Sequence, residues 1–219
     1  MFFDTLLLVF AYLTLGDDMS FVKKQIKLIR AKDPSIKTNF EVFLHPSFKA
    51  LFFHKLASFL YKKKFFFLAR LLSEKAKRKT GIEIHPGATI GEGLFIDHGT
   101  GVVIGETAVL GENITLYHGV TLGAVENKTG KRHPTIKDNV LIGTKATILG
   151  DIIVHENVKV GAASVILKDV PPNTTVVGIP GVIVRENGVK VKKNRSSHFA
   201  YPFYKSFIDI ICFFFFNLF

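Results

Sequence analysis

Two of the eight histidines stand beside charged residues at points where a regular sequence pattern breaks. His98 follows Asp97, and His133 follows Arg132. Histidine is the usual general base for a hydroxyl group, because it ionises near neutral pH. A neighbouring carboxylate fixes its tautomer and stabilises the imidazolium that forms on proton uptake. These pairs point to proton abstraction from a hydroxyl group, while ordinary surface histidines remain the alternative reading.

Spacing suggests a carboxylate partner for His98. Glu83 precedes Asp97 by 14 residues, and three six-residue units of the repeat described next make a coil of 18 residues. With the local break in the pattern, Glu83 could lie near His98 one coil away.

A six-residue repeat between Gly81 and Pro180 must position these residues. A period of six is neither helical nor a simple alternation, and it is typical of a solenoid whose short strands stack coil upon coil. Glycine often follows the aliphatic position, as at Gly105, and permits a tight corner. The sequence therefore predicts a mainly β fold, a parallel β-helix. The aliphatic positions are Ile84, Ile90, Ile96, Val102, Ile104, Leu110, Leu116, Leu122, Ile136, Ile142, Ile148, Val154, Val160 and Ile166.

Two irregularities interrupt the repeat. The phase slips by two residues over 98–101, and the polar, basic segment 124–134 leaves the pattern altogether. We expect this segment to be an exposed loop, and loops on rigid scaffolds often carry function. After the repeat, residues 176–184 are expected to form a closing strand.

The regions on either side of the repeat differ in character. Residues 1–18 form an apolar extension that is a poor signal peptide and too short for a membrane span. One hypothesis is that Met19 is the natural start, and whether residues 1–18 are native is left open. Residues 19–80 are predicted to form a helical domain, with helices near 21–30, 48–61 and 65–79. The β-helix is assigned to 81–187, and residues 188–219 form a basic, then apolar tail.

The chain is basic, with 29 Lys and Arg against 18 Asp and Glu and a net charge of +11. Solvated lysine faces are the simplest explanation, and attraction of an anionic ligand is the functional alternative. Cys212 is the only cysteine, so the sequence offers no disulfide framework and no cysteine-based metal cluster. This suits a reducing compartment.

Three stretches together resemble the serine acetyltransferase family. They are GIEIHPGATIGEGLFIDHGTGVVIGETAVLGENITLYHGVTLG, GKRHPTI and VPPNTTVVGIPG, and the resemblance runs from about Ala31 to Arg185. It implies a left-handed β-helix preceded by a small helical domain. It also implies an acyltransferase that moves the acetyl group of acetyl-CoA to the L-serine hydroxyl, for cysteine biosynthesis.

The resemblance also implies roles for individual residues. It makes His98 the general base and Glu83, where the family commonly has Asp, its orienting carboxylate. Arg132 would hold the serine carboxylate through a forked pair of hydrogen bonds. His133 would hold substrate and stabilise the oxyanion. The acidic residues assigned to substrate binding are Asp33, Asp97 and Glu106.

The same resemblance implies that CoA lies along the coils as a co-substrate, with no tightly bound cofactor and no metal. The sequence reads TLGAVE where the family usually has TLGGTG, so the path of the loop is expected to differ. Lysines at two positions would meet the phosphates of CoA. The implied CoA contacts are Gly123, Ala124, Thr144, Ala162, Lys159 and Lys168.

The implied partners are L-serine, acetyl-CoA and two further copies of the chain in a homotrimer, with a hexamer left open. A complex with the sulfhydrylase of the pathway is not expected, because the chain ends in Asn217-Leu218-Phe219 and not in Ile. No nucleic acid or membrane partner is expected, and the location is expected to be cytoplasmic. Three alternatives stay open: a related acetyltransferase acting on a sugar or other small acceptor, a zinc enzyme of the carbonic anhydrase type, and a trimeric scaffold.

Overall fold

The computed structural model describes residues 18–191. Four helices come first: α2 (Asp18–Lys32), the 3-10 helix η1 (Glu41–Leu44), α3 (Pro46–Lys62) and α4 (Phe66–Thr80). The helices predicted near 21–30, 48–61 and 65–79 are confirmed as α2, α3 and α4. Residues 1–17 of the expected apolar extension, and the expected tail from residue 192 onward, lie outside the described residues.

Local sequence explains where α3 begins and α4 ends. Pro46 occupies the first turn of α3, where its missing N–H costs nothing, and His45 caps the helix by accepting the Ser47 N–H at its Nδ1 atom. α4 ends at Gly81, whose φ of 71° is a left-handed conformation that glycine adopts readily. Gly81 then leads directly into the first strand.

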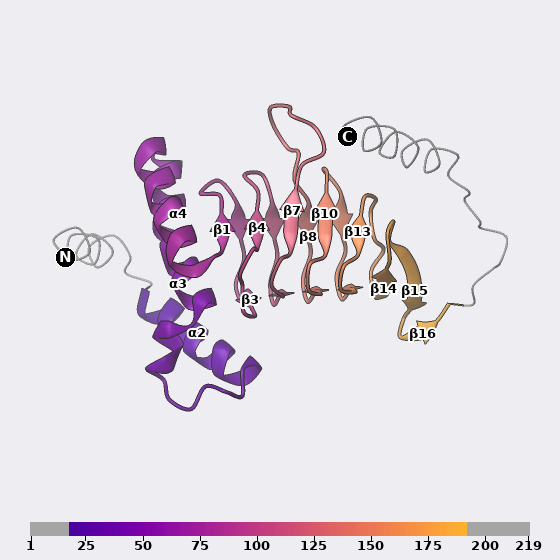
Figure 1. Cartoon of the computed structure of the whole chain (residues 1–219), viewed down its shortest axis with the longest axis horizontal. Helices are drawn as coiled ribbons and strands as arrows, with labels where there is room; N and C mark the ends of the chain where they lie inside the picture. Colours follow the sequence, from indigo (N-terminus) through magenta and orange to yellow (C-terminus); the bar gives the residue numbers. More distant parts are fainter. Residues whose placement is uncertain (1–17, 192–219) are drawn as a thin grey trace, which may run out of the picture.

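Three parallel sheets build the solenoid that follows (Figure 1). Sheet A holds β1, β4, β7, β10 and β13, and sheet B holds β2, β5, β8 and β11. Sheet C holds the parallel strands β3, β6, β9, β12 and β14, to which β15 and β16 are added antiparallel. The strand bounds are β1 Glu83–Ile84, β2 Thr89–Ile90, β3 Phe95–Ile96, β4 Val103–Ile104, β5 Val109–Leu110, β6 Thr115–Leu116, β7 Thr121–Gly123, β8 Thr135–Ile136, β9 Leu141–Ile142, β10 Thr147–Leu149, β11 Ile153–Val154, β12 Lys159–Val160, β13 Val165–Ile166, β14 Thr174–Val177, β15 Val182–Glu186 and β16 Val189–Lys190.

The aliphatic series predicts the core correctly, with one correction. Ile104 of sheet A pairs with Leu122 in the next coil, and equivalent side chains stack along the whole solenoid. Ile84 pairs with Ile104, so the first coil has 20 residues and absorbs the predicted slip of phase. Val102 directly precedes β4 and so stands two residues before Ile104, in the position that Val120 takes in the next coil.

The predicted single closing strand over 176–184 is wrong. β14 is followed by a turn with a cis Ile179–Pro180 peptide bond, and β15 returns antiparallel to it. Proline cannot donate a ladder hydrogen bond, so the chain breaks there into two strands. β16 then pairs with β15, which takes the sheet into the segment expected to be tail.

The helices close one end of the solenoid (Figure 1). Ala50 and Leu51 of α3 belong to the same buried core as the first coil. The Ser47 hydroxyl accepts the Ile96 N–H, and the Ser73 hydroxyl donates to the Ile84 carbonyl. Solenoid ends need such a cover because their last core layer would otherwise meet water.

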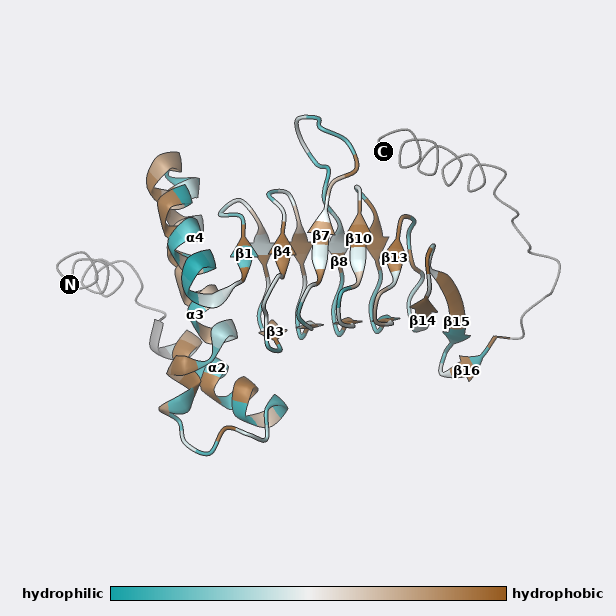
Figure 2. Cartoon of the chain, viewed as in Figure 1, coloured by the Kyte–Doolittle hydropathy of each residue, from teal (hydrophilic) through white to brown (hydrophobic). Residues whose placement is uncertain are grey.

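Both α2 and α4 contain hydrophobic and hydrophilic residues (Figure 2), as expected for helices that pack on one side and meet water on the other. The predicted loop over 124–134 is confirmed, since residues 125–130 are exposed and the loop projects between β7 and β8 (Figure 1). Within residues 18–191, no helix has the length and apolar character to cross a bilayer.

Candidate active site

The residues selected from the sequence lie mainly on two edges of the solenoid. The C–A edge consists of the turns that run from sheet C to sheet A, including 97–102, 117–120, 143–146 and 161–164. The A–B edge consists of the turns from sheet A to sheet B, including 85–88, 105–108 and 124–134. Sheet A lies between the two edges.

His98 and Asp97 lie on the C–A edge, directly after β3. His98 has a φ of 60°, which a non-glycine residue adopts only in special turns. Its side chain is exposed, and its ring meets that of His118 edge-to-face, with 6.1 Å between centroids. His118 was not selected from the sequence, although its 20-residue distance from His98 equals the length of the first coil.

Asp33 joins this edge from the end of α2. The Ser35 N–H donates to its Oδ1 atom over 2.9 Å, and hydrogen bonding from Ser35 lowers the pKa of Asp33. His45 and His98 are close enough to lower the Asp33 pKa further through their charges. The carboxylate is therefore held ionised next to the candidate base.

His45 is a second histidine at this edge that sequence reasoning missed. Its Nδ1 accepts the Ser47 N–H, so the neutral ring carries its proton on Nε2, 3.7 Å from the Asp33 Oδ2 atom. The ring stacks on Phe95 with 5.6 Å between centroids, and burial lowers the pKa of His45. Only the helix start at His45-Pro46 marks it in the sequence, and no spacing places it near His98.

His133 lies on the A–B edge and is nearly buried, with 8% of its surface exposed. The Thr107 N–H donates to its Nδ1 atom over 3.2 Å, and the Thr107 hydroxyl lies 2.9 Å from the same atom. A backbone N–H can only donate, so neutral His133 must carry its proton on Nε2. Burial lowers the pKa of His133, and the Arg132 cation lowers it further. His133 is therefore a neutral hydrogen-bond donor.

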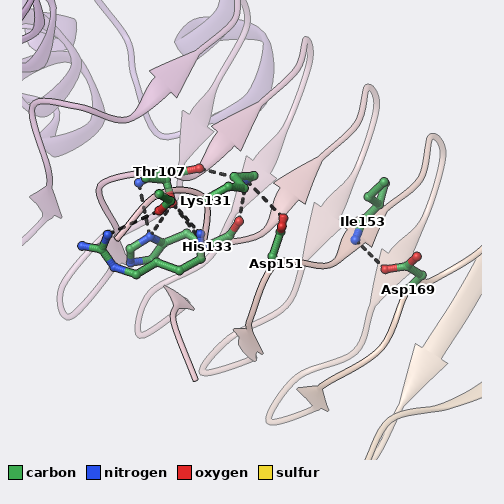
Figure 3. A network of polar contacts seen from close by, with 8 residues as sticks. Thr107, Lys131, His133, Asp151, Ile153 and Asp169 are labelled. Carbon is green, nitrogen blue, oxygen red and sulfur yellow. Dashed lines mark hydrogen bonds and ion pairs between the residues drawn. The ribbon is translucent and has the colours of Figure 1, made fainter. Parts of the chain in front are cut away.

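Lys131 holds the end of the 124–134 loop in place, where His133 lies (Figure 3). Its Nζ atom donates to the carbonyl oxygens of Thr107 and His133, over 2.8 and 2.5 Å, and lies 4.0 Å from Asp151. The Thr107 hydroxyl in turn accepts the N–H groups of Arg132 and His133. Thr107 and Lys131 were not selected from the sequence, although each adjoins a selected residue.

Gly105 makes room for the His133 ring. A Cβ atom at this position would overlap the imidazole. Gly105 is not among the glycines with positive φ, so the predicted reason for it, a tight corner, is wrong. It is required by the space that the ring occupies.

Arg132 and Glu106 form an ion pair next to His133. The Arg132 Nη2 atom donates to Glu106 Oε2 over 2.5 Å, and the Tyr61 hydroxyl donates to Oε1 over 2.8 Å. The Tyr61 hydroxyl and the Arg132 guanidinium both lower the pKa of Glu106. Tyr61 comes from the last turns of α3 and was missed, because no repeat relates it to the solenoid.

Glu83 does not meet His98 within the described protomer. Its carboxylate pairs with Lys77 Nζ over 2.6 Å. Glu83 stands on β1 of sheet A, in contact with α4, and α4 supplies Lys77. The pairing of Glu83 with His98 therefore stays a prediction.

The residues selected for CoA are spread over both edges. Thr144 and Ala162 occupy the same place in successive turns of the C–A edge, as the register Ile142↔Val160 requires. Gly123 and Ala124 end β7 and open the long loop, Lys168 lies on the A–B edge, and Lys159 is exposed on β12 of sheet C. One protomer therefore does not gather them at one place.

The two edges also do not meet within one protomer. Among the described residues, neither Asp97 nor His98 makes a hydrogen bond, ion pair or ring contact with Arg132 or His133. Residues 18–191 also contain no group of three or more His, Cys, Asp or Glu arranged to hold a metal ion.

Comparison with known proteins gives consistent matches. Residues 133–168 match the bacterial transferase hexapeptide family (six repeats). The serine acetyltransferase of Bacillus subtilis is 53% identical over 174 residues, which cover 79% of this chain and 80% of that protein.

Solved structures agree. The serine acetyltransferase of Neisseria gonorrhoeae is 42% identical with a TM-score of 0.73, over 78% of this chain and 65% of that one. The same enzyme in complex with serine gives 41% and 0.75, over 79% and 71%. The Brucella abortus enzyme in complex with coenzyme A gives 39% and 0.76, over 84% and 72%. These matches confirm the predicted left-handed β-helix with a helical region before it.

Proposed function

Because this chain belongs to the serine acetyltransferase family, we propose that it transfers the acetyl group of acetyl-CoA to the hydroxyl of L-serine, giving O-acetylserine and CoA. One observation carries the proposal beyond the similarity. One edge holds a base beside the ionised Asp33 carboxylate, and the other holds a cation with a neutral hydrogen-bond donor. L-Serine has the matching ammonium, hydroxyl and carboxylate groups.

Each group of serine has a proposed partner. Asp33 and Asp97 receive the ammonium group, and the free part of the Arg132 guanidinium receives the carboxylate. These contacts place the serine hydroxyl at His98. Fixing the substrate at three points supplies much of the rate, because the reacting atoms then meet without further loss of freedom.

The chemical step is a direct transfer. His98 removes the hydroxyl proton as the serine oxygen bonds to the thioester carbonyl carbon. The Nε2–H of His133 stabilises the oxyanion that develops on the carbonyl oxygen. The carbon–sulfur bond then breaks, and the imidazolium of His98 returns the proton to the departing CoA thiolate. Glu83, which the resemblance makes the orienting carboxylate of His98, pairs with Lys77 in this protomer, and its role beside His98 stays a prediction.

We further propose that the working site forms between copies of the chain, with the C–A edge of one facing the A–B edge of the next. A cyclic trimer closes such an arrangement, because each copy then offers one edge to each neighbour. The separation of His98 from His133 within one protomer supports this. The same pairing of edges would unite Thr144 and Ala162 with Gly123 and Ala124 around CoA.

Free thiol release from acetyl-CoA tests the function. We expect release that depends on L-serine and is lost in a His98→Ala variant that retains its oligomeric state. Release with a sugar acceptor but not with serine would favour the related acetyltransferase, whose acceptor has no use for Asp33 and Arg132. No release with either acceptor would remove the proposal and favour the scaffold.

A further inference from the structure

We propose that Tyr61 is a positioning residue that sets the direction of the Arg132 guanidinium, acting through Glu106. The inference deepens the proposed function and rests on it, because it concerns recognition of the serine carboxylate. It also changes the expected role of Glu106, from a substrate-binding acid to a bridge between the helical region and the site.

The bridge uses both oxygens of one carboxylate. The Tyr61 hydroxyl donates to Glu106 Oε1, and Arg132 Nη2 donates to Oε2. Hydrogen bonds that involve a charged group are short and strong. The Arg132 and Glu106 side chains are only 24% and 30% exposed, so water competes weakly for these contacts. Glu106 therefore has a fixed orientation.

The Tyr61 ring is itself held from two sides. It meets Phe66 edge-to-face with 5.0 Å between centroids, and His85 edge-to-face with 5.7 Å. A Cβ atom at Gly87 would lie 3.2 Å from the Tyr61 Cε1 atom, so the backbone approaches the ring closely there. α3, α4 and the turn after β1 thus fix the place of the hydroxyl group.

Fixing Nη2 decides what the rest of Arg132 can do. Within the part of the chain that the structure describes, the only other contact of the guanidinium is a long one of 3.5 Å from Nη1 to the Gly130 carbonyl. The remaining N–H groups are available for a forked contact with a carboxylate. If the Glu106 carboxylate could rotate, the Arg132 guanidinium would rotate with it. Its N–H groups would then be misaligned with the serine carboxylate, and small misalignments in a preorganised site lower the rate strongly.

The test compares L-serine with L-serinamide, which has no carboxylate, in Tyr61→Phe. Phenylalanine keeps the ring contacts and removes only the hydroxyl. We expect kcat/KM for L-serine to fall about tenfold through KM, as for loss of a hydrogen bond to a charged group, while kcat/KM for serinamide stays unchanged. Ser58→Ala, which removes a hydroxyl one turn earlier in α3, is the matched control and should leave both substrates unaffected.

A double-mutant cycle with Glu106→Ala checks the route. If Tyr61 acts through Glu106, Tyr61→Phe causes no further loss in that background. Three outcomes would overturn the inference. They are an equal loss of kcat/KM for serine and serinamide, additive losses in the double-mutant cycle, and a Tyr61→Phe enzyme whose kcat/KM equals that of the wild type. If the wild-type protein itself releases no thiol with serine, the proposed function fails first, which is a distinct result.

Discussion

The two edges of the solenoid differ in how far their histidines are exposed and hydrogen-bonded. His98 on the C–A edge is exposed, and among the described residues it makes a ring contact with His118 but no hydrogen bond or ion pair. His133 on the A–B edge is 8% exposed and locked through Nδ1 by Thr107. A base must be free to take a proton and return it, whereas a group that stabilises an oxyanion works best when preorganised. The difference in packing thus follows the difference in proposed role.

One helix supports both edges. α3 has 17 residues, which span about 25 Å at 1.5 Å per residue. His45 caps its start and lies against Asp33, while Tyr61 near its end contacts Glu106. The helical region therefore does more than cover the end of the core. It sets the position of polar groups on both edges, so damage to α3 should affect both.

The largest expected effect comes from removing the histidine of each edge in a different variant. His98→Ala and His133→Ala homotrimers should each lose about 1,000-fold in kcat, as for loss of a principal catalytic group. Chains with these two changes, unfolded and refolded together in equal amounts, should regain activity at about one quarter of their interfaces, because an intact His98 then meets an intact His133 in the next copy. Thiol release per chain measures the recovery.

The control for this experiment is the same mixture without refolding, in which subunits do not exchange. No recovery after verified subunit exchange would contradict the shared site. It would place both histidines of a working site in one protomer.

Gly105→Ala probes the tight packing of the A–B edge. The added methyl group needs the space of the His133 ring, so we expect about a 100-fold loss in kcat/KM as the imidazole is displaced. Adding Gly105→Ala to His133→Ala should cost nothing further, because the ring is then absent. Equal losses in both backgrounds would show damage to the coil and not to the position of the ring.

Acid should loosen both edges together through His54, in the middle of α3. Burial lowers its pKa to about 4, and its neighbours are the Ala88 carbonyl, Lys62 and His85. The unfolded chain binds the proton from about pH 6.5 downward. The folded protein therefore loses stability as the pH falls from about 6.5 to 4, by about 3 kcal/mol, and has it in full above that window.

Urea unfolding at fixed protein concentration measures this effect at pH 7.5 and pH 4.5. His54→Gln keeps a donor for Ala88 but does not titrate, so its loss on acidification should be smaller than that of wild type. Asp33 and Glu106 also contribute to the loss, because their pKa values are lowered in the folded protein. Their contribution to stability is lost mainly as the pH falls below the unfolded pKa values of about 4. An identical loss in both proteins would show that His54 is not responsible.

Periodicity explains how much of this could be predicted. A repeat of six fixes the stacking of side chains such as Ile104 and Leu122, so the fold and its core followed from the sequence. The breaks in the repeat located the longer first coil and the exposed loop. His98 and His133 were found because they stand at those breaks, although their roles rest on similarity and await the tests above.

Contacts outside the repeat could not be predicted in the same way. His45 caps the start of α3 and Tyr61 lies near its end, and the placement of this helix depends on tertiary packing, which no spacing in the sequence encodes. Glu83 was assigned to His98 by the resemblance, with the spacing in support, and that pairing stays a prediction. The ion pair of Glu83 with Lys77 of α4 could not be predicted from the repeat. Gly105 was given a conformational reason when the true one is the neighbouring ring. Such an error arises where a side chain from another element decides the geometry.

The smallest expected effect concerns His45, the buried histidine at the C–A edge. His45→Asn keeps an acceptor for the Ser47 N–H but removes the Nε2–H beside Asp33. Near pH 8 we expect a rise of about threefold in KM for serine and an unchanged kcat, as for a weak contact.

The pH dependence distinguishes this from a general loss of structure. The acidic and histidine side chains that face His45 are those of Asp33, Asp97 and His98. Burial keeps the pKa of His45 below its ordinary value, so the ring becomes a cation only as the pH falls below about 6.5. That cation competes with the serine ammonium for Asp33, so KM of the wild type should rise on acidification more than KM of the variant. If KM of the wild type and KM of the variant depend on pH in the same way, His45 acts only as a helix cap. The C–A edge would then lack a second residue that positions its substrate-binding group, whereas the A–B edge has several.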